Sequence, residues 1–217
     1  MKKVLGVLLV FCLLAAMLLL LPACVVEPEG QLPTCEVGDE WVWSYAMEET
    51  TYTLTEEVTG EETVEGRDCY VIDMLLDGSS MKYWMDKATC IYGVKMEMTG
   101  TSNGTVYTWT ETYSYNPWAP LFPLEVGKEV ETEMTSIVYI DGSQQGDPVV
   151  TTEKYRVDSK EDVTVAAGTF SCWKLIMYDG AGSVTGTMWW SDEAKTMVKS
   201  TDADGNTMME LLSYSVS

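Results

Sequence analysis

The side chains that could carry chemistry in this sequence are carboxylates and thiols, because the chain contains no histidine. Histidine is the commonest general base and metal ligand, so its absence disfavours catalytic triads and zinc-hydrolase sites. Two carboxylates, Asp86 and Asp192, each follow a tryptophan by two residues, and paired carboxylates can perform acid–base chemistry. Their position just after a predicted strand is more typical of turn-capping. We therefore predict no catalytic residue and no enzymatic activity, with a carboxylate-dependent hydrolase as a remote alternative.

Two further polar segments could be taken for binding or modification sites. The segment Asp202-Ala203-Asp204-Gly205-Asn206 has the composition of a calcium loop, but it lacks the EF-hand spacing and the acidic twelfth residue. The segment Asn103-Gly104-Thr105 fits a glycosylation sequon, although Asn-Gly is also a favoured hairpin turn. We interpret both segments as turns and predict no metal site and no cofactor.

Tryptophans are the strongest candidates for contact with a ligand. Trp41 and Trp43 share one face of a predicted strand, and three more occupy strands that could line the same concave surface: Trp84, Trp109 and Trp190. Such a surface could bind acyl chains, another hydrophobic ligand or a protein partner. The same side chains could instead fill an ordinary β core, each burying about 150–250 Å². In that case the protein would be a structural or adhesive module with a filled core and no ligand pocket, which is the alternative function.

Composition restricts the class of partner. The 217 residues include 34 acidic and 13 basic side chains, with a net charge of −21. This charge argues against nucleic acid or an anionic lipid surface as partner, because both would repel the protein. The 46% apolar fraction, with 8 Trp and 12 Tyr, excludes a disordered acidic tail. The length suits one compact domain preceded by a leader.

The elements that must position these residues are strands. Apolar and polar residues alternate over thirteen short runs: 41–47, 51–58, 69–76, 80–86, 90–99, 104–115, 128–140, 149–158, 161–165, 170–178, 184–191, 195–201 and 207–216. Turn dipeptides such as Asp77-Gly78 and Asp141-Gly142 separate many of them. No segment of helical length carries a 3.6-residue apolar stripe. The sequence therefore predicts an all-β antiparallel fold of about twelve strands.

Landmarks recur in the same order in two parts of the chain, which predicts two tandem halves, 36–116 and 125–217, joined by the proline-rich segment 117–124. The recurring landmarks are Glu36-Val37-Gly38 with Glu125-Val126-Gly127, Cys69–Ile72 with Cys172–Leu175, Tyr83–Asp86 with Trp189–Asp192, and Ala88 with Ala194. Twisted open sheets of more than about ten strands curl or close. We therefore expect one strongly curved sheet, a half-barrel or clam, and keep two small barrels as the alternative.

Four cysteines of the expected mature domain allow three disulfide connectivities. Cys69 and Cys172 occupy equivalent positions on apolar strands, so each is expected to be a small core residue. Cys35 and Cys90 have no counterparts in the second half, and strand registers place both near one end of the sheet. We predict a Cys35–Cys90 disulfide.

The N-terminus has the pattern of an export signal, with Lys2 and Lys3 before an apolar run over 4–21. That run is close to the roughly 18-residue minimum for crossing a bilayer, so an uncleaved helix is the alternative. The segment Leu21-Pro22-Ala23-Cys24 resembles the lipobox of bacterial lipoproteins. The resemblance implies a signal peptide over 1–23 and acyl chains on Cys24. It also implies a tether over 24–35 and a cell-envelope location, at the outer membrane in a two-membrane cell.

The Trp-x-Asp segments, Trp84-Met85-Asp86 and Trp190-Ser191-Asp192, resemble the W-x-D-x-x-T hairpin of the lipoprotein-carrier superfamily. That resemblance implies a curved antiparallel half-barrel able to hold acyl chains. Two further segments, Gly38–Trp41 and Val163–Phe170, resemble motifs of uncharacterised secreted β-proteins. The expected function is therefore that of a lipid-anchored, non-enzymatic envelope protein with a hydrophobic ligand or a surface protein as partner.

Overall fold

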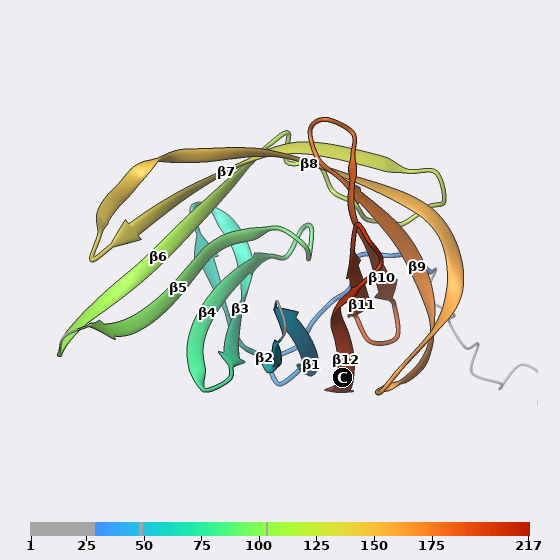
Figure 1. The fold of residues 1–217 in the computed structure, drawn as a ribbon, viewed down its shortest axis with the longest axis horizontal. Coiled ribbons are helices and arrows are strands. Elements are labelled where there is room, and N and C mark those ends of the chain that lie inside the picture. The colour runs from blue at the N-terminus through green and yellow to red at the C-terminus, as the bar shows by residue number, and fades with distance from the viewer. Residues whose placement is uncertain (1–28, 48–49, 103) are drawn as a thin grey trace, which may run out of the picture.

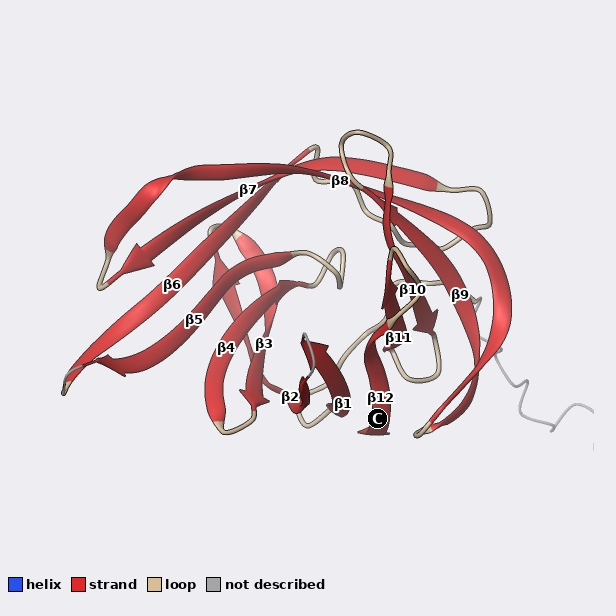
Figure 2. Cartoon of the chain, in the orientation of Figure 1, coloured by secondary structure: helices blue, strands red, loops and turns tan. Residues whose placement is uncertain are grey.

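The computed structural model describes residues 29–47, 50–102 and 104–217. Within these ranges the chain is all-β, as the alternation predicts, and contains no helix (Figure 2). No helix in this part of the chain is therefore long and apolar enough to cross a membrane. The strands are β1 (Glu40–Met47), β2 (Thr50–Val64), β3 (Arg67–Leu76), β4 (Ser79–Asp86), β5 (Gly93–Ser102), β6 (Thr105–Asn116), β7 (Glu129–Ile140), β8 (Ser143–Val165), β9 (Gly168–Tyr178), β10 (Val184–Ser191), β11 (Thr196–Asp202) and β12 (Thr207–Ser215). The expected lipidated Cys24 and the signal segment lie outside the described residues.

The twelve strands form one antiparallel ring (Figure 1). Each strand pairs with the next along the chain, and β1 also pairs with β12, with Trp41 opposite Tyr214 and Trp43 opposite Leu211. This confirms the strongly curved antiparallel sheet of about twelve strands. The closure between β1 and β12 is a further finding, and it leaves no unpaired sheet edge. A single ring also excludes two separate small barrels.

Local turn chemistry sets two of the hairpins that separate the strands. Asp77 and Gly78 have φ angles of 46° and 85°, and Asp141 and Gly142 have φ angles of 49° and 77°. Positive φ at both central residues is the type I′ pattern, whose twist matches that of paired strands. The Asp-Gly dipeptides therefore connect β3 to β4 and β7 to β8, as predicted.

One predicted boundary is wrong. The runs 149–158 and 161–165 are a single strand, β8, of 23 residues. The apparent break coincides with a shift in the pairing of β8 with β9 between Val157 and Ser159. Such a bulge absorbs one extra residue without ending the strand. The alternation is therefore interrupted in the sequence while the backbone continues.

A tryptophan–glutamate hydrogen bond occurs in each half of the ring. In the second half, its donor is one residue away from the tryptophan that the sequence landmarks align with Trp84. Trp84 Nε1 donates to Glu62 Oε2 at 2.7 Å, and Trp189 Nε1 donates to Glu161 Oε1 at 2.7 Å. The residue that corresponds to Trp84 in these contacts is therefore Trp189, whereas the landmarks align Trp84 with Trp190. Since adjacent strand residues face opposite sides, this offset separates Trp84 and Trp190 across the wall.

The main core contains residues of several strands together with residues of segments outside the strands. Leu121, Phe122 and Leu124 of the join between β6 and β7 are buried in it, as is Cys35 of the N-terminal segment. The ring of Phe122 meets that of Trp190 edge to face, with centroids 5.1 Å apart. Segments outside the sheet therefore fill part of the space that the ring encloses.

Candidate functional site

The strand registers identify the side chains that face the inside of the ring, because residues directly opposite in an antiparallel pair share a face. From β1 across to β6, one such row of directly opposed residues consists of Trp41, Glu56, Met74, Met81, Met98 and Trp109. Trp41 belongs to the main core and Met74 packs against it, so this row faces the inside of the ring. Methionine is prominent on it, and its flexible thioether adapts to irregular shapes.

A pocket of about 300 Å³ lies on this inner side. Its walls come from seven strands, from β1 to β5 and from β11 and β12, and consist of Trp43, Glu56, Met74, Tyr83, Met96, Thr196, Met197 and Met209. The volume is at the lower end of the range for small-molecule sites, about 300–1,000 Å³. The lining is apolar except for one carboxylate and two hydroxyls. Such a lining suits a hydrophobic ligand that has one polar group.

Glu56 is the charged member of this lining. It stands opposite Trp41 on one side and Met74 on the other, and its side chain keeps partial access to solvent. Protein surrounds the carboxyl group, and this burial raises its pKa from 4.5 to about 7. Near neutral pH, Glu56 can therefore either accept a proton or carry a charge.

Tyrosines and Glu153 extend the polar part of the interior. Tyr155 Oη donates to Glu153 Oε2 at 3.1 Å, and Tyr92 stacks on Tyr115 with ring centroids 4.3 Å apart. Burial, followed by the charge of Glu153, raises the pKa of Tyr92 to about 12 and also raises the pKa of Tyr155 well above its ordinary value of 10. These phenols stay protonated at physiological pH and can donate hydrogen bonds.

Trp41 and Trp43, the first two predicted ligand residues, lie together on the inner face. Their rings stack with centroids 6.4 Å apart, and their side chains are 3% and 2% exposed. Trp41 Nε1 donates to the carbonyl oxygen of Ala194 at 2.7 Å, and Trp43 Nε1 donates to that of Met197 at 3.2 Å. Of the two, only Trp43 lines the pocket.

Trp109 and Trp190 also face inward, although neither lines the pocket. Trp109 is half-buried and belongs to the inner row through its pairing with Met98. Trp190 is buried in the main core against Phe122, and its Nε1 has no hydrogen-bond partner in the described part of the chain.

Trp84 lies on the opposite side of the wall, which corrects its expected place in the lining. It is buried in a second cluster with Cys69, Val71 and Val94, and Trp118 packs against this cluster. Strand alternation is the reason: Tyr83 and Met85 pack against the main core, so the residue between them points outward. The structure thus places Trp41, Trp43, Trp109 and Trp190 on the inner face and Trp84 on the outer face.

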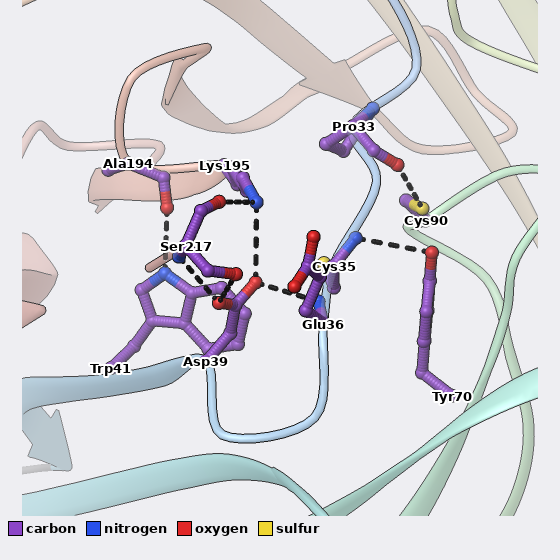
Figure 3. A network of polar contacts seen from close by, with 10 residues as sticks. All are labelled: Pro33, Cys35, Glu36, Asp39, Trp41, Tyr70, Cys90, Ala194, Lys195 and Ser217. Atoms are coloured by element: carbon purple, nitrogen blue, oxygen red, sulfur yellow. Dashed lines mark hydrogen bonds and ion pairs between the residues drawn. The ribbon is translucent and has the colours of Figure 1, made fainter. Parts of the chain in front are cut away.

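The four described cysteines are buried free thiols. Cys35 and Cys90 belong to the same core cluster (Figure 3). Burial, and then the neighbouring Cys35, raises the pKa of Cys90 to about 12. Cys90 Sγ donates to the carbonyl oxygen of Pro33 at 3.4 Å, while Cys35 N–H donates to Tyr70 Oη at 3.2 Å. The structure contains no bond between the two sulfurs, and the disulfide stays a prediction.

Asp39 organises the seam between β1 and the end of the described chain (Figure 3). It is 1% exposed and accepts hydrogen bonds from the Ser217 amide at 2.9 Å, the Ser217 hydroxyl at 3.0 Å and the Glu36 amide at 2.9 Å. Lys195 Nζ lies 3.4 Å from its carboxylate. Burial raises the pKa of Asp39, but these hydrogen bonds and the lysine charge outweigh it and lower the pKa below 3.8. This network is structural: it holds the closing strands together.

The carboxylate pair considered for acid–base chemistry has separate partners. Asp86 is buried, accepts a hydrogen bond from Trp118 Nε1 at 3.1 Å and lies 3.8 Å from Arg67. Asp192 accepts hydrogen bonds from the Gly30 amide at 2.8 Å and from Trp173 Nε1 at 3.1 Å. Each side chain thus tethers a nearby segment. Among the described residues, no group of three or more cysteine, aspartate or glutamate side chains is placed to hold a metal.

The segment 202–206 forms a turn, as interpreted from its sequence. Asp202 Oδ1 accepts hydrogen bonds from the amides of Asp204 at 3.0 Å and Asn206 at 2.8 Å.

The sequence interpretation missed Glu56 as a residue of the pocket. The signal was present, because Leu54, Glu56 and Val58 alternate and both apolar neighbours are buried in the main core. A charged residue at a strand position where the alternation predicts an apolar one indicates such a site.

Comparisons with known proteins give only weak similarities. No protein-family model and no curated protein matches the chain. One similar solved structure is a candidate lipoprotein from Parabacteroides distasonis, with 13% identity, a TM-score of 0.38, and coverage of 87% of this chain and 100% of that chain. Another is a candidate exported protein with a YmcC-like fold from Bacteroides fragilis, with 11% identity, a TM-score of 0.41, and coverage of 86% and 99%. Similarity at this level assigns no function to the chain.

Proposed function

We propose that this chain is a non-enzymatic, lipid-anchored protein of the cell envelope that binds a hydrophobic small molecule inside its barrel. The supporting observation is the apolar pocket on the inner face, with Trp43 and four methionines in its lining. A protein partner on the outer surface is the less favoured alternative, because the apolar pocket lies on the inner face.

The contrast between the two parts of the interior supports this proposal. Val58, Val157 and Leu211 in the main core are fully buried. The pocket residues Met74 and Met209 are only partly buried although they face inward. Inward-facing side chains with remaining accessible surface leave room for another molecule. A structural module with a completely filled core would not need this arrangement.

The export and anchoring part of the proposal comes from the leader. The lipobox-like segment ends at Cys24, and the described structure begins a few residues later, at Glu29. Acyl chains contribute about 0.8 kcal/mol per buried methylene, so two or three chains hold a protein firmly to a bilayer. A short tether would keep the barrel near lipid, which is one source of hydrophobic ligands.

Native mass spectrometry of the full chain, purified from envelopes and released from detergent in the gas phase, tests the function. We expect a bound mass that extracts into organic solvent. Met74→Trp places a larger side chain in the pocket and should remove this mass. Leu75→Trp is the matched control, because Leu75 is the next residue of β3 and is 48% exposed.

A bare protein that also takes up no added alkanol or lipid would refute the ligand-binding function and favour the structural module. Equal loss of the bound mass in the Met74→Trp and Leu75→Trp proteins would place the ligand outside the pocket. Circular dichroism of both variants establishes whether the barrel is retained.

A further inference from the structure

Taking the proposed ligand site as its basis, we infer that the ligand carries a positive charge beside its hydrophobic part, and that Glu56 receives this charge. The ligand class is a cationic amphiphile such as an alkylamine or alkylammonium compound. The inference depends on three features of the pocket: its carboxylate, the placement of the cationic side chains, and its aromatic walls.

The position of Glu56 gives the pocket a negative end. Glu56 lines the pocket directly, between residues that are aromatic or apolar. Two more carboxylates face the same interior: Glu111 is directly opposite Met96, and Glu153 is hydrogen-bonded to Tyr155. The charge of each carboxylate acts on a tyrosine of the interior. Glu56 acts on Tyr83, Glu111 acts on Tyr113, and Glu153 acts on Tyr115.

The cationic side chains nearest to the pocket in sequence point away from it. Lys82 precedes the pocket residue Tyr83 and lies 3.2 Å from Asp73, and Lys95 precedes Met96 and lies 2.8 Å from Glu97. Lys195 precedes Thr196 and lies 3.4 Å from Asp39. In the described part of the chain, no ion pair involves Glu56, Glu111 or Glu153. A carboxylate that is partly removed from water and has no cation beside it is unfavourable when charged, so a cationic ligand would supply the missing partner.

Aromatic rings at the pocket favour the same kind of ligand. Trp43 and Tyr83 belong to its walls, and ring faces attract alkylammonium groups through the cation–π interaction. The methionines supply an adaptable apolar surface for the hydrocarbon part. An alkyl carboxylate or sulfate would place a second negative charge beside Glu56, which is unfavourable.

Titration calorimetry of the full chain in nanodiscs, with empty nanodiscs as the reference, tests this inference. The probes are hexyltrimethylammonium, hexanol and hexyl sulfate, which share one hydrocarbon chain and differ in charge. We expect the cation to bind about tenfold more tightly than hexanol, and hexyl sulfate to bind more weakly than hexanol. Glu56→Gln should abolish the preference for the cation over hexanol.

Glu57→Gln is the control, because it removes the same charge from the adjacent, exposed residue of β2. If Glu57→Gln lowers cation binding as much as Glu56→Gln does, the general negative charge of the protein is responsible and the inference is wrong. Binding of hexanol without preference for the cation would also overturn the inference but would leave the proposed function standing. Binding of none of the three probes would refute both.

Discussion

Glu56 and Glu57 are adjacent in the chain but face opposite sides of the barrel wall. Glu56 lines the apolar pocket beside Met74, whereas Glu57 is exposed. The alternation of a β-strand produces this separation. Two identical side chains therefore differ in dielectric environment, and their substitutions should affect stability differently.

The stability of the protein should fall as the pH rises from about 4.5, the ordinary pKa of Glu56, through about 7, its pKa in the folded protein. Burial raises its pKa from 4.5 to about 7, so the folded protein binds this proton more tightly than the unfolded chain does. The stabilisation is fully present below pH 4.5 and is lost as the pH rises through about 7. Its maximum size is roughly 3 kcal/mol, from about 1.4 kcal/mol per pKa unit. Tyr83, which lines the same pocket, stays neutral over this range.

Urea unfolding of wild type and Glu56→Gln between pH 4 and pH 8 checks this prediction. We expect the variant to be more stable than wild type at pH 8 and to have a flatter pH profile. Glu57→Gln should retain the wild-type slope. Parallel profiles for wild type and Glu56→Gln would show that the carboxyl group is not responsible.

Oxidation should link Cys35 to Cys90. Both thiols are buried in the same cluster, and each loses its hydrogen atom to an external disulfide or oxygen when the bond forms. The chain-entropy relation gives a stabilisation of about 4 kcal/mol for a loop between residues 35 and 90. Denaturing alkylation of the exported protein, followed by peptide mapping, should modify Cys69 and Cys172 before reduction and all four cysteines after it. Alkylation of Cys35 without reductant would refute the pairing, and Cys35→Ser should abolish the stabilisation.

Removal of the Asp39 carboxylate should open the seam beside β1. The buried side chain accepts three hydrogen bonds from Glu36 and Ser217 and contacts Lys195, and Asp39→Ala removes the shared acceptor of these contacts. We expect a loss of about 3 kcal/mol in the free energy of unfolding, measured in urea. Hydrogen exchange should increase first in β1 and β12. Asp158→Ala, which removes an exposed ion pair with Arg156, should change stability by less than about 1 kcal/mol.

Cys24 should carry the membrane anchor. Metabolic labelling with palmitate should label the wild-type protein and leave Cys24→Ala unlabelled, because the thioether needs the cysteine sulfur. The anchored protein should fractionate with membranes and resist extraction by high salt, since its attachment is hydrophobic. Release of the wild-type protein by salt alone would contradict a covalent anchor.

The sequence determined the features that depend on neighbouring residues. Alternation with a period of two predicted the all-β fold, because each strand must place apolar side chains on one face. The Asp-Gly turns at 77–78 and 141–142 were also local, since these residues tolerate positive φ angles. The same alternation correctly placed Trp41 and Trp43 on one face, where their rings stack.

Only the tertiary structure decided which face is inside and where the wall closes. Trp84 and Trp109 both lie on alternating strands, but Trp84 faces an outer cluster whereas Trp109 belongs to the inner row. Strand registers and bulges set this choice, and a shift of one residue reverses the face of every side chain. The pairing of β1 with β12 joins segments at opposite ends of the described chain. Alternation is a local property, whereas the pocket around Glu56 exists only after distant strands have paired in one register.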